Sequence, residues 1–311
     1  MRILLVELLG GFGDLLLALP AIHALARSHP GDELDVLTFS PGDALLRHDP
    51  HVSRVMSTSD HTDGAPRRAV EQALAASYDL VVTTTTYDGI GALCGGPDLW
   101  RGSPPDELVD RRFLRLLIAD GLVDPALVDL PLTVVLTPQE SVELGGSNVV
   151  LVPGSGMAVK RWPYWRQLAA DLGADLAAGL DRPWSTEPVP GTRVLPPGDL
   201  RLLAAQLADV GRRGGVVVGG DTGPVRLAAA VGARTVGLYG PTAASRYGLG
   251  AAGTSLQGLP GCEVRQPSAI TEQECWWSGR CPLTGAGPAC LADLTPIHVR
   301  EALTAGNTPA G

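Results

Sequence analysis

The chain has 311 residues, of which 45% are hydrophobic and 18% charged, and its formal net charge is −9. This composition is typical of a soluble globular protein with room for two domains of about 150 residues each. The acidic balance argues against broad binding to nucleic acid or to anionic membrane surfaces. No uncharged apolar run approaches the roughly 18 residues of a membrane span.

The apolar run at the N-terminus does not resemble a secretory signal. Glu7 and Asp14 interrupt it, and the glycines around Phe12 indicate a turn rather than a cleavage site. We therefore expect a cytoplasmic protein, in which free thiols are the default state of cysteine.

In the first half of the chain, apolar runs alternate with amphipathic segments. Strands are predicted at residues 3–8, 34–39, 52–56 and 79–84. Helices are predicted at residues 15–27, 42–47, 67–77 and 106–120, and Pro20 lies inside the first of them. Strands that alternate with helices and are apolar along their whole length predict a parallel α/β sheet.

A polar, turn-rich stretch at residues 137–147 predicts a linker, after which the pattern restarts. Further strands are predicted at 149–152, 216–218 and 235–239, and further helices at 163–172, 199–210, 225–231 and 296–305. Residues 179–198 show little periodicity. The predicted fold class is α/β, with two Rossmann-like parallel-sheet domains, 1–140 and 147–294, that face a central cleft.

Residues 219–230 join a β-branched strand to a helix through the turn Asp221-Thr222-Gly223, with Pro224 in the first helical turn. Backbone N–H groups at the positive end of a helix suit a phosphate or a sugar hydroxyl. An Asp/Thr helix cap without a ligand explains the same residues, and this turn alone does not decide between the two.

A second loop, residues 153–163, follows the first strand of the second half. Ser155 and Gly156 permit close approach of the backbone to a ligand, and Lys160 and Arg161 offer positive charge to a diphosphate. Lys160 is the single lysine among 24 basic residues, which favours a specific role for its ammonium group. The loop lacks the Gly-Lys-Ser/Thr ending of a P-loop, so nucleotide hydrolysis is disfavoured. A solvated basic pair is the alternative interpretation.

A glycine-rich turn that ends at Asp14 follows the first predicted strand, at the sheet edge where open α/β sheets bind ligands. It differs from the dinucleotide fingerprint because Leu16 occupies the third glycine position and no acidic residue ends the second strand. An NAD-dependent oxidoreductase is therefore disfavoured. A carboxylate in a domain cleft is a candidate general base, which indicates Asp14, and a helix N-cap is its alternative role.

Four stretches together resemble glycosyltransferase family 9, the family of the lipopolysaccharide heptosyltransferases. They are Gly-Phe-Gly-Asp with its Ala-Leu-Pro-Ala helix (12–24), Pro-Gly-Ser-Gly to Lys-Arg-Trp-Pro (153–163), Asp-Thr-Gly-Pro to Leu-Ala-Ala-Ala (221–230) and Gly-Leu-Tyr-Gly-Pro-Thr (237–242). Each is weak alone, whereas their order and spacing over nearly the whole chain are specific. The resemblance implies a GT-B fold and an inverting transfer, typically of heptose from ADP-heptose, to a hydroxyl of a glycan or a small natural product. It implies no cofactor and no required metal.

The resemblance also implies roles for the domains. Residues 1–140 would bind the acceptor, with Gly11, Phe12 and Gly13 as the acceptor-side loop, and residues 147–294 would bind the nucleotide sugar. The closing helix in residues 295–311 would cross back onto the N-terminal domain.

By the same similarity, Asp14 would deprotonate the acceptor hydroxyl, Lys160 would contact the diphosphate, and Asp221 would contact the donor sugar. Backbone N–H groups would bind the phosphates. The whole donor-binding set would be Ser155, Gly156, Lys160, Arg161, Asp221, Thr222, Gly223, Pro224 and Arg226. The chain has no Asp-x-Asp motif, so the ammonium group and helix N-termini would replace a metal in stabilising the leaving diphosphate.

Two departures from the family pattern bear on function. Arg226 stands where the family usually has His, and a guanidinium is a candidate diphosphate clamp but no acid near neutral pH. The usual Gly-Gly-Pro turn is not recognisable in residues 172–198, which indicates a trimmed nucleotide pocket and weakens the preference for one nucleotide base. A non-catalytic GT-B relic that binds nucleotide sugars is the alternative function, ahead of the oxidoreductase.

The tail of the chain contains four cysteines, Cys262, Cys275, Cys281 and Cys290, while Cys94 lies apart. Their spacings include no Cys-x₂-Cys pair, so a zinc site is weakly supported and free thiols are expected. The neighbouring Trp276-Trp277 pair fits either a core anchor or a platform for sugar stacking.

Overall fold

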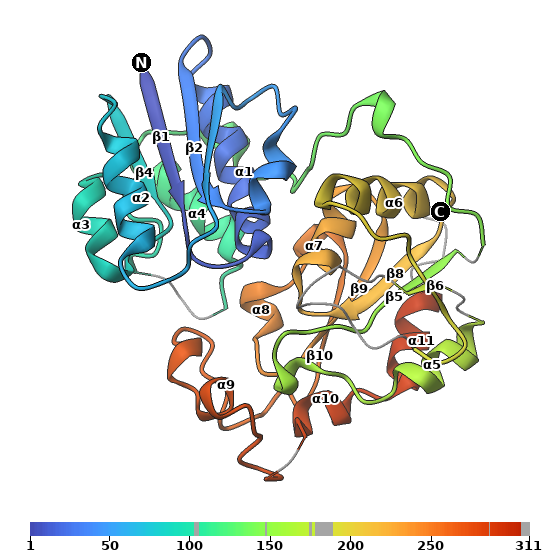
Figure 1. Cartoon of the computed structure of the whole chain (residues 1–311). Helices are drawn as coiled ribbons and strands as arrows, with labels where there is room; N and C mark the ends of the chain where they lie inside the picture. The colour runs from blue at the N-terminus through green and yellow to red at the C-terminus, as the bar shows by residue number, and fades with distance from the viewer. Residues whose placement is uncertain (103–105, 147, 174–175, 178–188, 286, 306–311) are drawn as a thin grey trace. The chain divides into compact units, whose positions relative to one another are not determined.

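The structure is a computed structural model that describes residues 1–311 apart from 103–105, 147, 174–175, 178–188, 286 and 306–311. The chain consists of two compact units, Met1–Thr137 and Pro138–Gly311 (Figure 1). Each unit has its own parallel sheet with helices packed on it, so the predicted α/β class is confirmed. Among the described residues, no helix has the length and apolarity that a membrane span requires.

The first unit contains a four-stranded parallel sheet in the order β3-β2-β1-β4. Its strands are β1 (Arg2–Glu7), β2 (Glu33–Phe39), β3 (Arg54–Thr58) and β4 (Leu80–Thr83). Its helices are α1 (Phe12–Ser28), α2 (Ala65–Leu74), α3 (Ile90–Cys94) and α4 (Val109–Ala119), with 3₁₀ turns η1 (Gly42–Leu46), η2 (Tyr87–Gly89) and η3 (Pro125–Leu127). The predicted strands are all present within a few residues, whereas the helix predicted at 42–47 is a 3₁₀ turn.

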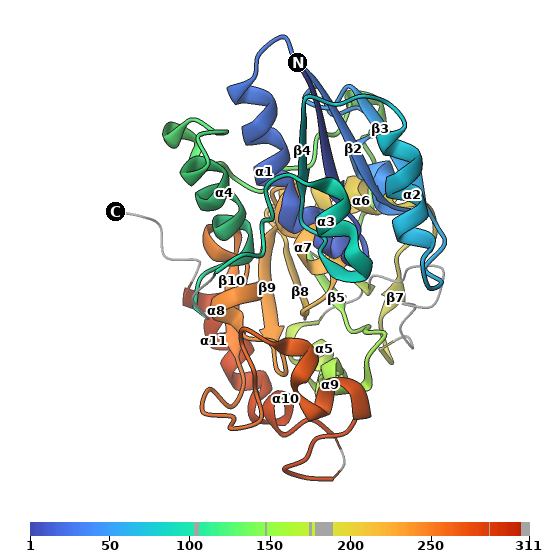
Figure 2. The ribbon, with the colours of Figure 1, turned by 90° about the vertical axis from the view of Figure 1, so that its left-hand side faces the viewer.

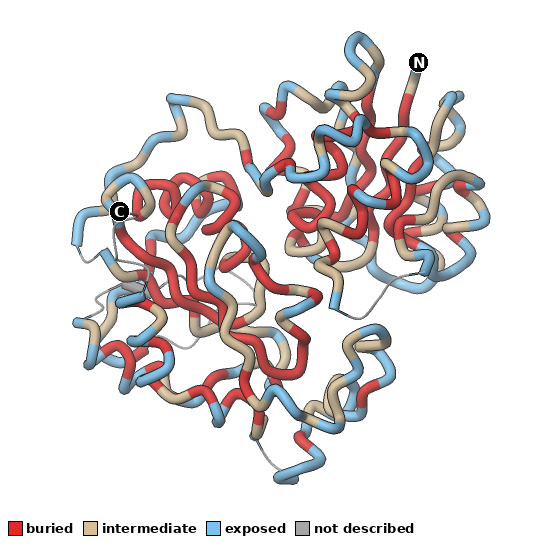
Figure 3. The backbone as a smooth tube through the Cα atoms, turned by 180° about the vertical axis from the view of Figure 1, so that it is seen from behind, coloured by how far each residue is buried: buried red, intermediate tan, exposed pale blue. Residues whose placement is uncertain are grey.

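Strand β1 is buried on both faces, as its unbroken apolar sequence predicts. Leu4 and Val6 pack with Val70 of α2 and Ile90 of α3. Leu5 is also fully buried, and because side chains alternate along a strand it points to the opposite face, where α1 contacts both β1 and α4. The buried strands stand out in red in Figure 3. The carboxyl end of β1 is thereby fixed in a rigid frame.

The second unit contains a six-stranded parallel sheet in the order β10-β9-β8-β5-β6-β7. Its strands are β5 (Val149–Val152), β6 (Leu176–Ala177), β7 (Arg193–Val194), β8 (Val216–Gly220), β9 (Arg234–Tyr239) and β10 (Thr254–Gln257). Its helices are α5 (Trp165–Leu172), α6 (Leu200–Arg212), α7 (Gly223–Ala230), α8 (Ala244–Tyr247), α9 (Glu274–Ser278), α10 (Ala289–Asp293) and α11 (Pro296–Ala305). Its 3₁₀ turns are η4 (Pro138–Glu140), η5 (Ala158–Lys160), η6 (Gly250–Ala252) and η7 (Ile270–Glu272). The first half of the weakly periodic segment at 179–198, residues 179–188, lies outside the described residues.

The closing helix α11 packs inside the second unit. Val299 and Leu303, four positions apart on one helix face, belong to a core cluster with Leu168 of α5 and Leu238 of β9. The side chain of Arg234 donates a hydrogen bond of 3.3 Å to the carbonyl of Ala302. Figures 1 and 2 both show α5, α10 and α11 along the same side of this sheet. The apolar face of α11 is therefore buried on β9 of its own unit, and its expected contact with the N-terminal domain stays a prediction.

Close packing at the carboxyl end of β8 requires glycine. A Cβ on Gly219 would lie 2.3 Å from Cγ2 of Val225 and 2.7 Å from Cβ of Val152. Because a side chain is missing here, β8, β5 and the start of α7 approach closely. The turn that follows β8 is thereby held against the loop that follows β5.

Candidate active site

Two loops of the second unit meet at the carboxyl ends of neighbouring strands. Val152, at the end of β5, is the register partner of Gly219 in β8. The loop 153–160 follows β5, and a Cβ on Gly220 would lie 3.4 Å from the carbonyl oxygen of Lys160. The two predicted ligand-binding loops are therefore neighbours at the sheet edge where α/β proteins bind ligands.

Lys160 and Asp221 form an ion pair at this edge. The Lys160 Nζ lies 2.8 Å from Asp221 Oδ2 and 3.4 Å from the Asp221 backbone oxygen. Their side chains are 14% and 13% exposed. Burial alone would raise the pKa of the Asp221 carboxyl, but the charges of Lys160 and Arg226 outweigh it, so that pKa is lowered. Asp221 is therefore an anion at neutral pH, and the single lysine of the chain is held beside it.

Arg226 is a buried side chain of α7 that faces the same carboxylate. Its Nη2 lies 3.8 Å from Asp221 Oδ1 and donates a 2.5 Å hydrogen bond to the carbonyl of Tyr247. Its Nη1 donates a 3.4 Å hydrogen bond to the carbonyl of Gly248. The guanidinium thus joins α7 to the end of α8 and adds a second positive charge beside Asp221.

The N-terminus of α7 lies directly after Asp221. Its N-cap residue, Thr222, has extended backbone angles, and its side chain makes no capping hydrogen bond. The Thr222 hydroxyl instead donates to the Gly220 carbonyl at 3.4 Å, and the Asp221 carboxylate pairs with Lys160. The first turn therefore has backbone N–H groups, that of Gly223 among them, that no N-cap side chain satisfies, whereas Pro224 has no N–H to satisfy. Such a terminus favours an anion.

The other predicted residues of the 153–160 loop have local partners. The Ser155 hydroxyl accepts a 3.2 Å hydrogen bond from the backbone N–H of Met157. Arg161 is exposed and its Nε donates to the Ser155 carbonyl at 3.4 Å, while Gly156 is exposed. The structure thus brings Lys160, Asp221 and Arg226 together and places Arg161 on the outer side of the loop.

Trp276 of α9 is a site residue whose contact the sequence analysis missed. The Lys160 Nζ lies 5.0 Å from the centre of one ring of Trp276, within the range of a cation–π interaction. The adjacent Trp277 is 72% exposed. The tryptophan pair was visible in the sequence, but no local pattern connects it with Lys160.

The predicted acceptor-side loop forms the start of α1 in the first unit. Gly11 is exposed, Phe12 is buried, and the backbone N–H of Asp14 donates a 2.9 Å hydrogen bond to the Gly11 carbonyl. A Cβ on Gly10 would lie 2.6 Å from Asp14 Oδ2, so the carboxylate folds back over the turn. A larger residue at position 10 would therefore displace the end of the Asp14 side chain.

A second carboxyl group, Glu7, lies in the same turn region and was not predicted to be part of the site. Glu7 is 1% exposed at the end of β1. It accepts hydrogen bonds from the Leu9 backbone N–H at 3.0 Å and from the Thr38 hydroxyl at 3.1 Å. Burial, reinforced by the negative charge of Asp14, raises the pKa of Glu7 to about 8. The signal in the sequence was a carboxyl group inside an apolar strand.

The four tail cysteines line one small cavity of the second unit. Val159, which precedes Lys160, and Pro241, which follows β9, also line it. All five cysteines of the chain are free thiols, and burial raises the pKa of Cys290 to about 11. Within the described residues, no group of three or more His, Cys, Asp or Glu side chains is arranged to hold a metal ion.

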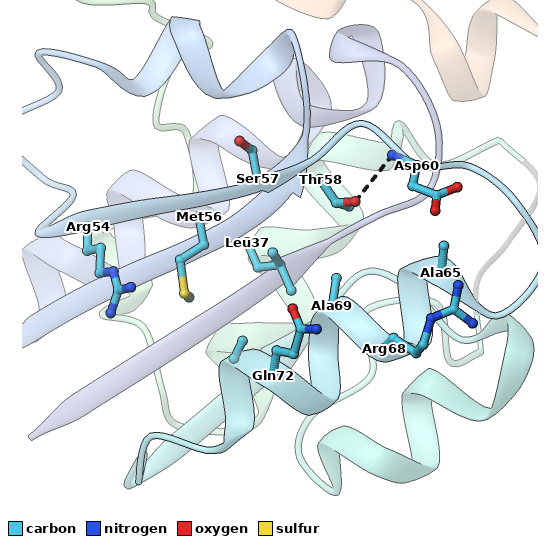
Figure 4. A pocket seen from close by; sticks show the side chains of 11 residues that line it. Leu37, Arg54, Met56, Ser57, Thr58, Asp60, Ala65, Arg68, Ala69 and Gln72 are labelled. Carbon is cyan, nitrogen blue, oxygen red and sulfur yellow. Dashed lines mark hydrogen bonds between the residues drawn. The ribbon is translucent and has the colours of Figure 1, made fainter.

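A larger cavity of about 400 Å³ lies between β3 and α2 in the first unit (Figure 4). Three alanines of α2, Ala65, Ala69 and Ala73, leave space above the sheet, and Arg54 and Arg68 contribute to its lining. Its lining includes none of the residues predicted for the site. The cavity follows from small side chains on the helix face that packs against an edge strand.

Comparison with known proteins identifies relatives for this arrangement. Residues 175–259 match the family model described as Glycosyltransferase family 9 (heptosyltransferase). The chain is 27% identical over 294 residues to lipopolysaccharide heptosyltransferase 1 of Pseudomonas aeruginosa PAO1, covering 78% of this chain and 79% of that protein.

Solved structures resemble the fold over nearly its whole length. A glycosyltransferase family 9 protein from Veillonella parvula matches with a TM-score of 0.73 and 16% identity, covering 98% of this chain and 96% of that one. The E. coli heptosyltransferase WaaC with ADP matches with a TM-score of 0.65 and 20% identity, covering 98% and 99%. These matches confirm the resemblance to family 9 and the GT-B fold class.

Proposed function

We propose that this glycosyltransferase, which resembles family 9, transfers a heptose or a related sugar from an ADP-sugar to an acceptor hydroxyl. The transfer inverts the anomeric centre and requires no metal. The donor nucleotide is suggested by relatives that are named heptosyltransferases, one of them solved with ADP.

The observation that carries this proposal is the Lys160–Asp221 pair at the start of α7. A diphosphate is a compact dianion, and here an ammonium group is paired with the residue directly before a helix N-terminus that has no side-chain cap. Lys160 binds the diphosphate, with the N–H groups of Thr222 and Gly223 on the other oxygens. Asp221 accepts a hydrogen bond from a hydroxyl of the donor sugar, and Arg226 keeps that carboxylate ionised and in place.

The same groups supply the charge stabilisation that the reaction needs. As the bond between the anomeric carbon and the phosphate oxygen breaks, negative charge grows on the leaving ADP. We expect Lys160 and the positive end of α7 to bind that charge, which is the task of a metal in other transferases. Loss of one such group typically lowers kcat by about 10²–10³.

Asp14 serves as the general base. In a single inverting displacement, its carboxylate takes the proton of the acceptor hydroxyl while that oxygen attacks the anomeric carbon. The electron pair of the broken bond leaves with ADP. Gly10 gives the carboxylate room over the turn, and Glu7, protonated at neutral pH, adds no second negative charge there.

The test is turnover of the purified protein with a panel of ADP- and UDP-sugars and candidate acceptor glycans. We expect an acceptor-dependent release of ADP and a glycosylated product by mass spectrometry. Asp14→Asn should abolish transfer and leave the Kd for ADP unchanged, whereas Asp63→Asn, at an exposed carboxyl of the same unit, should leave both unchanged. Release of UDP alone would overturn the donor assignment. ADP binding without any transfer by the wild type would indicate the non-catalytic relic instead.

A further inference from the structure

Residues 258–285, here called the cysteine segment, connect β10 to the residues before α10 and are not explained by the proposed chemistry. The segment contains η7 and α9 and carries Trp276. It is built onto the Gly240–Pro241 turn that follows β9, through two buried or half-buried side chains.

Arg265 makes the first attachment. Its Nη2 donates to the carbonyls of Gly240 and Gly258 at 2.7 Å each, and its Nε donates to Gly240 at 3.0 Å. Its Nη1 donates to the Leu259 carbonyl at 3.0 Å. The Arg265 guanidinium thus links the start of the cysteine segment to the residue that follows β9 by hydrogen bonds.

Gln273 makes the second attachment, directly before α9. It is 1% exposed, and its amide donates to the Pro241 carbonyl at 3.1 Å and accepts from the Gln266 N–H at 2.9 Å. The backbone N–H of Trp276 donates to the Gln273 carbonyl at 3.1 Å. Because Gln273 is fixed to the sheet, the position of Trp276 is fixed as well.

The cavity beneath the segment links it to the donor loop. Cys275, the residue before Trp276, lines this cavity together with Val159, the residue before Lys160. The residues that precede Lys160 and Trp276 in the sequence therefore line the same cavity. The Lys160–Trp276 contact therefore joins η5 to α9, two segments that also line a common cavity.

We propose that Trp276 is a positioning residue that preorganises Lys160 for the donor diphosphate, so that the cysteine segment is part of the donor site. The proposal rests on the function proposed above. Lys160 has a flexible four-carbon stem and three N–H donors, of which Asp221 takes one or two. The indole face attracts the ammonium group and excludes water from one of its sides, and at least one N–H donor is left for a phosphate oxygen. A side chain held in this way loses less entropy when the ligand binds.

The experiment measures the Kd for ADP by calorimetry in matched variants of the full chain. Trp276→Leu should weaken ADP binding by about 3- to 10-fold, from the usual strength of a partly buried cation–π contact. Trp276→Phe, which keeps an aromatic face, should stay within about 2-fold of the wild type. Trp277→Leu, the same change at the exposed neighbour, should also stay within about 2-fold.

A double-mutant cycle separates positioning from a general effect on folding. In a Lys160→Met background, Trp276→Leu should cause no further loss of ADP affinity, because the group it positions is gone. An equal loss in both backgrounds, or a loss that Trp277→Leu reproduces, would overturn the inference. ADP binding that Lys160→Met weakens but Trp276→Leu does not would overturn it while the proposed function stands. Failure of the wild type to bind ADP would overturn both.

Discussion

Replacement of Glu7 by glutamine should change how the stability of the first unit depends on pH. The Glu7 carboxyl is buried and accepts two hydrogen bonds, and its pKa is raised from 4.5 to about 8 by burial and by the charge of Asp14. In the unfolded chain the same group titrates near its ordinary value. The native state therefore holds a proton between about pH 4.5 and pH 8 that the unfolded state releases.

The sign and size of the effect follow from this difference. Below pH 4.5 the Glu7 carboxyl is protonated in both the native and the unfolded state, so it does not change the free energy of unfolding. As the pH rises toward 8, the native state must either keep the proton or bury a charge, and the free energy of unfolding falls. A shift from 4.5 to about 8 corresponds to a loss of about 5 kcal/mol of unfolding free energy across this interval. Glutamine has nearly the same shape and does not titrate, so Glu7→Gln should remove this loss.

Differential scanning calorimetry from pH 5 to pH 8 is a suitable assay, because it resolves the unfolding of separate units. The Tm of the wild type relative to that of Glu7→Gln should fall by on the order of 10 °C over this range. Glu33→Gln, at an exposed carboxyl of the same sheet, should leave the pH dependence unchanged. A difference in Tm between the wild type and Glu7→Gln that stays constant from pH 5 to pH 8 would refute the assignment of Glu7 as a buried, protonated acid.

Three further predictions concern the second unit. Gly219→Ala should lower the free energy of unfolding by about 1–3 kcal/mol in thermal unfolding, because the new Cβ would lie 2.3 Å from a methyl carbon of Val225. Gly261→Ala is the control and should be nearly neutral, because a Cβ there would have no atom within 4 Å. Asp221→Asn should cost about 2–4 kcal/mol at pH 7 because it leaves the Lys160 ammonium partly buried without its anion. Because the pKa of Asp221 is lowered, this contribution is complete above the ordinary carboxyl pKa and is lost only in stronger acid. Urea titrations should therefore show the cost of Asp221→Asn shrinking only as the pH falls below that ordinary value. Arg265→Met should raise hydrogen exchange in residues 258–285 and leave exchange in the first unit unchanged.

Much of this fold could be predicted because its signals are local. Apolar runs marked the core strands of both sheets, and Gly and Pro marked the turns that end at Asp14 and begin at Asp221. Strands β6 and β7 have two residues each, too few for a period to show. The helix expected at 42–47 is a 3₁₀ turn, a difference that a five-residue segment does not encode clearly.

The candidate site was less predictable because its contacts join distant residues. The sequence analysis named Lys160 and Asp221 for different parts of the donor, and their pairing depends on β5 and β8 being neighbours in the sheet. The stacking of Trp276 on Lys160 depends on how Arg265 and Gln273 fold the cysteine segment against the end of β9. Hydrogen bonds from side chains to distant backbone carbonyls leave no periodic pattern in the sequence from which they could be predicted. Sequence analysis therefore found the charged groups and missed the aromatic ring beside them.

A crystal structure of the protein with ADP tests most directly the claim that the second unit holds a nucleotide diphosphate at the start of α7. We expect phosphate oxygens within about 3 Å of Lys160 Nζ and of the backbone nitrogen of Thr222 or Gly223. A diphosphate bound elsewhere, with Lys160 still paired to Asp221 and no ligand atom near α7, would contradict the account.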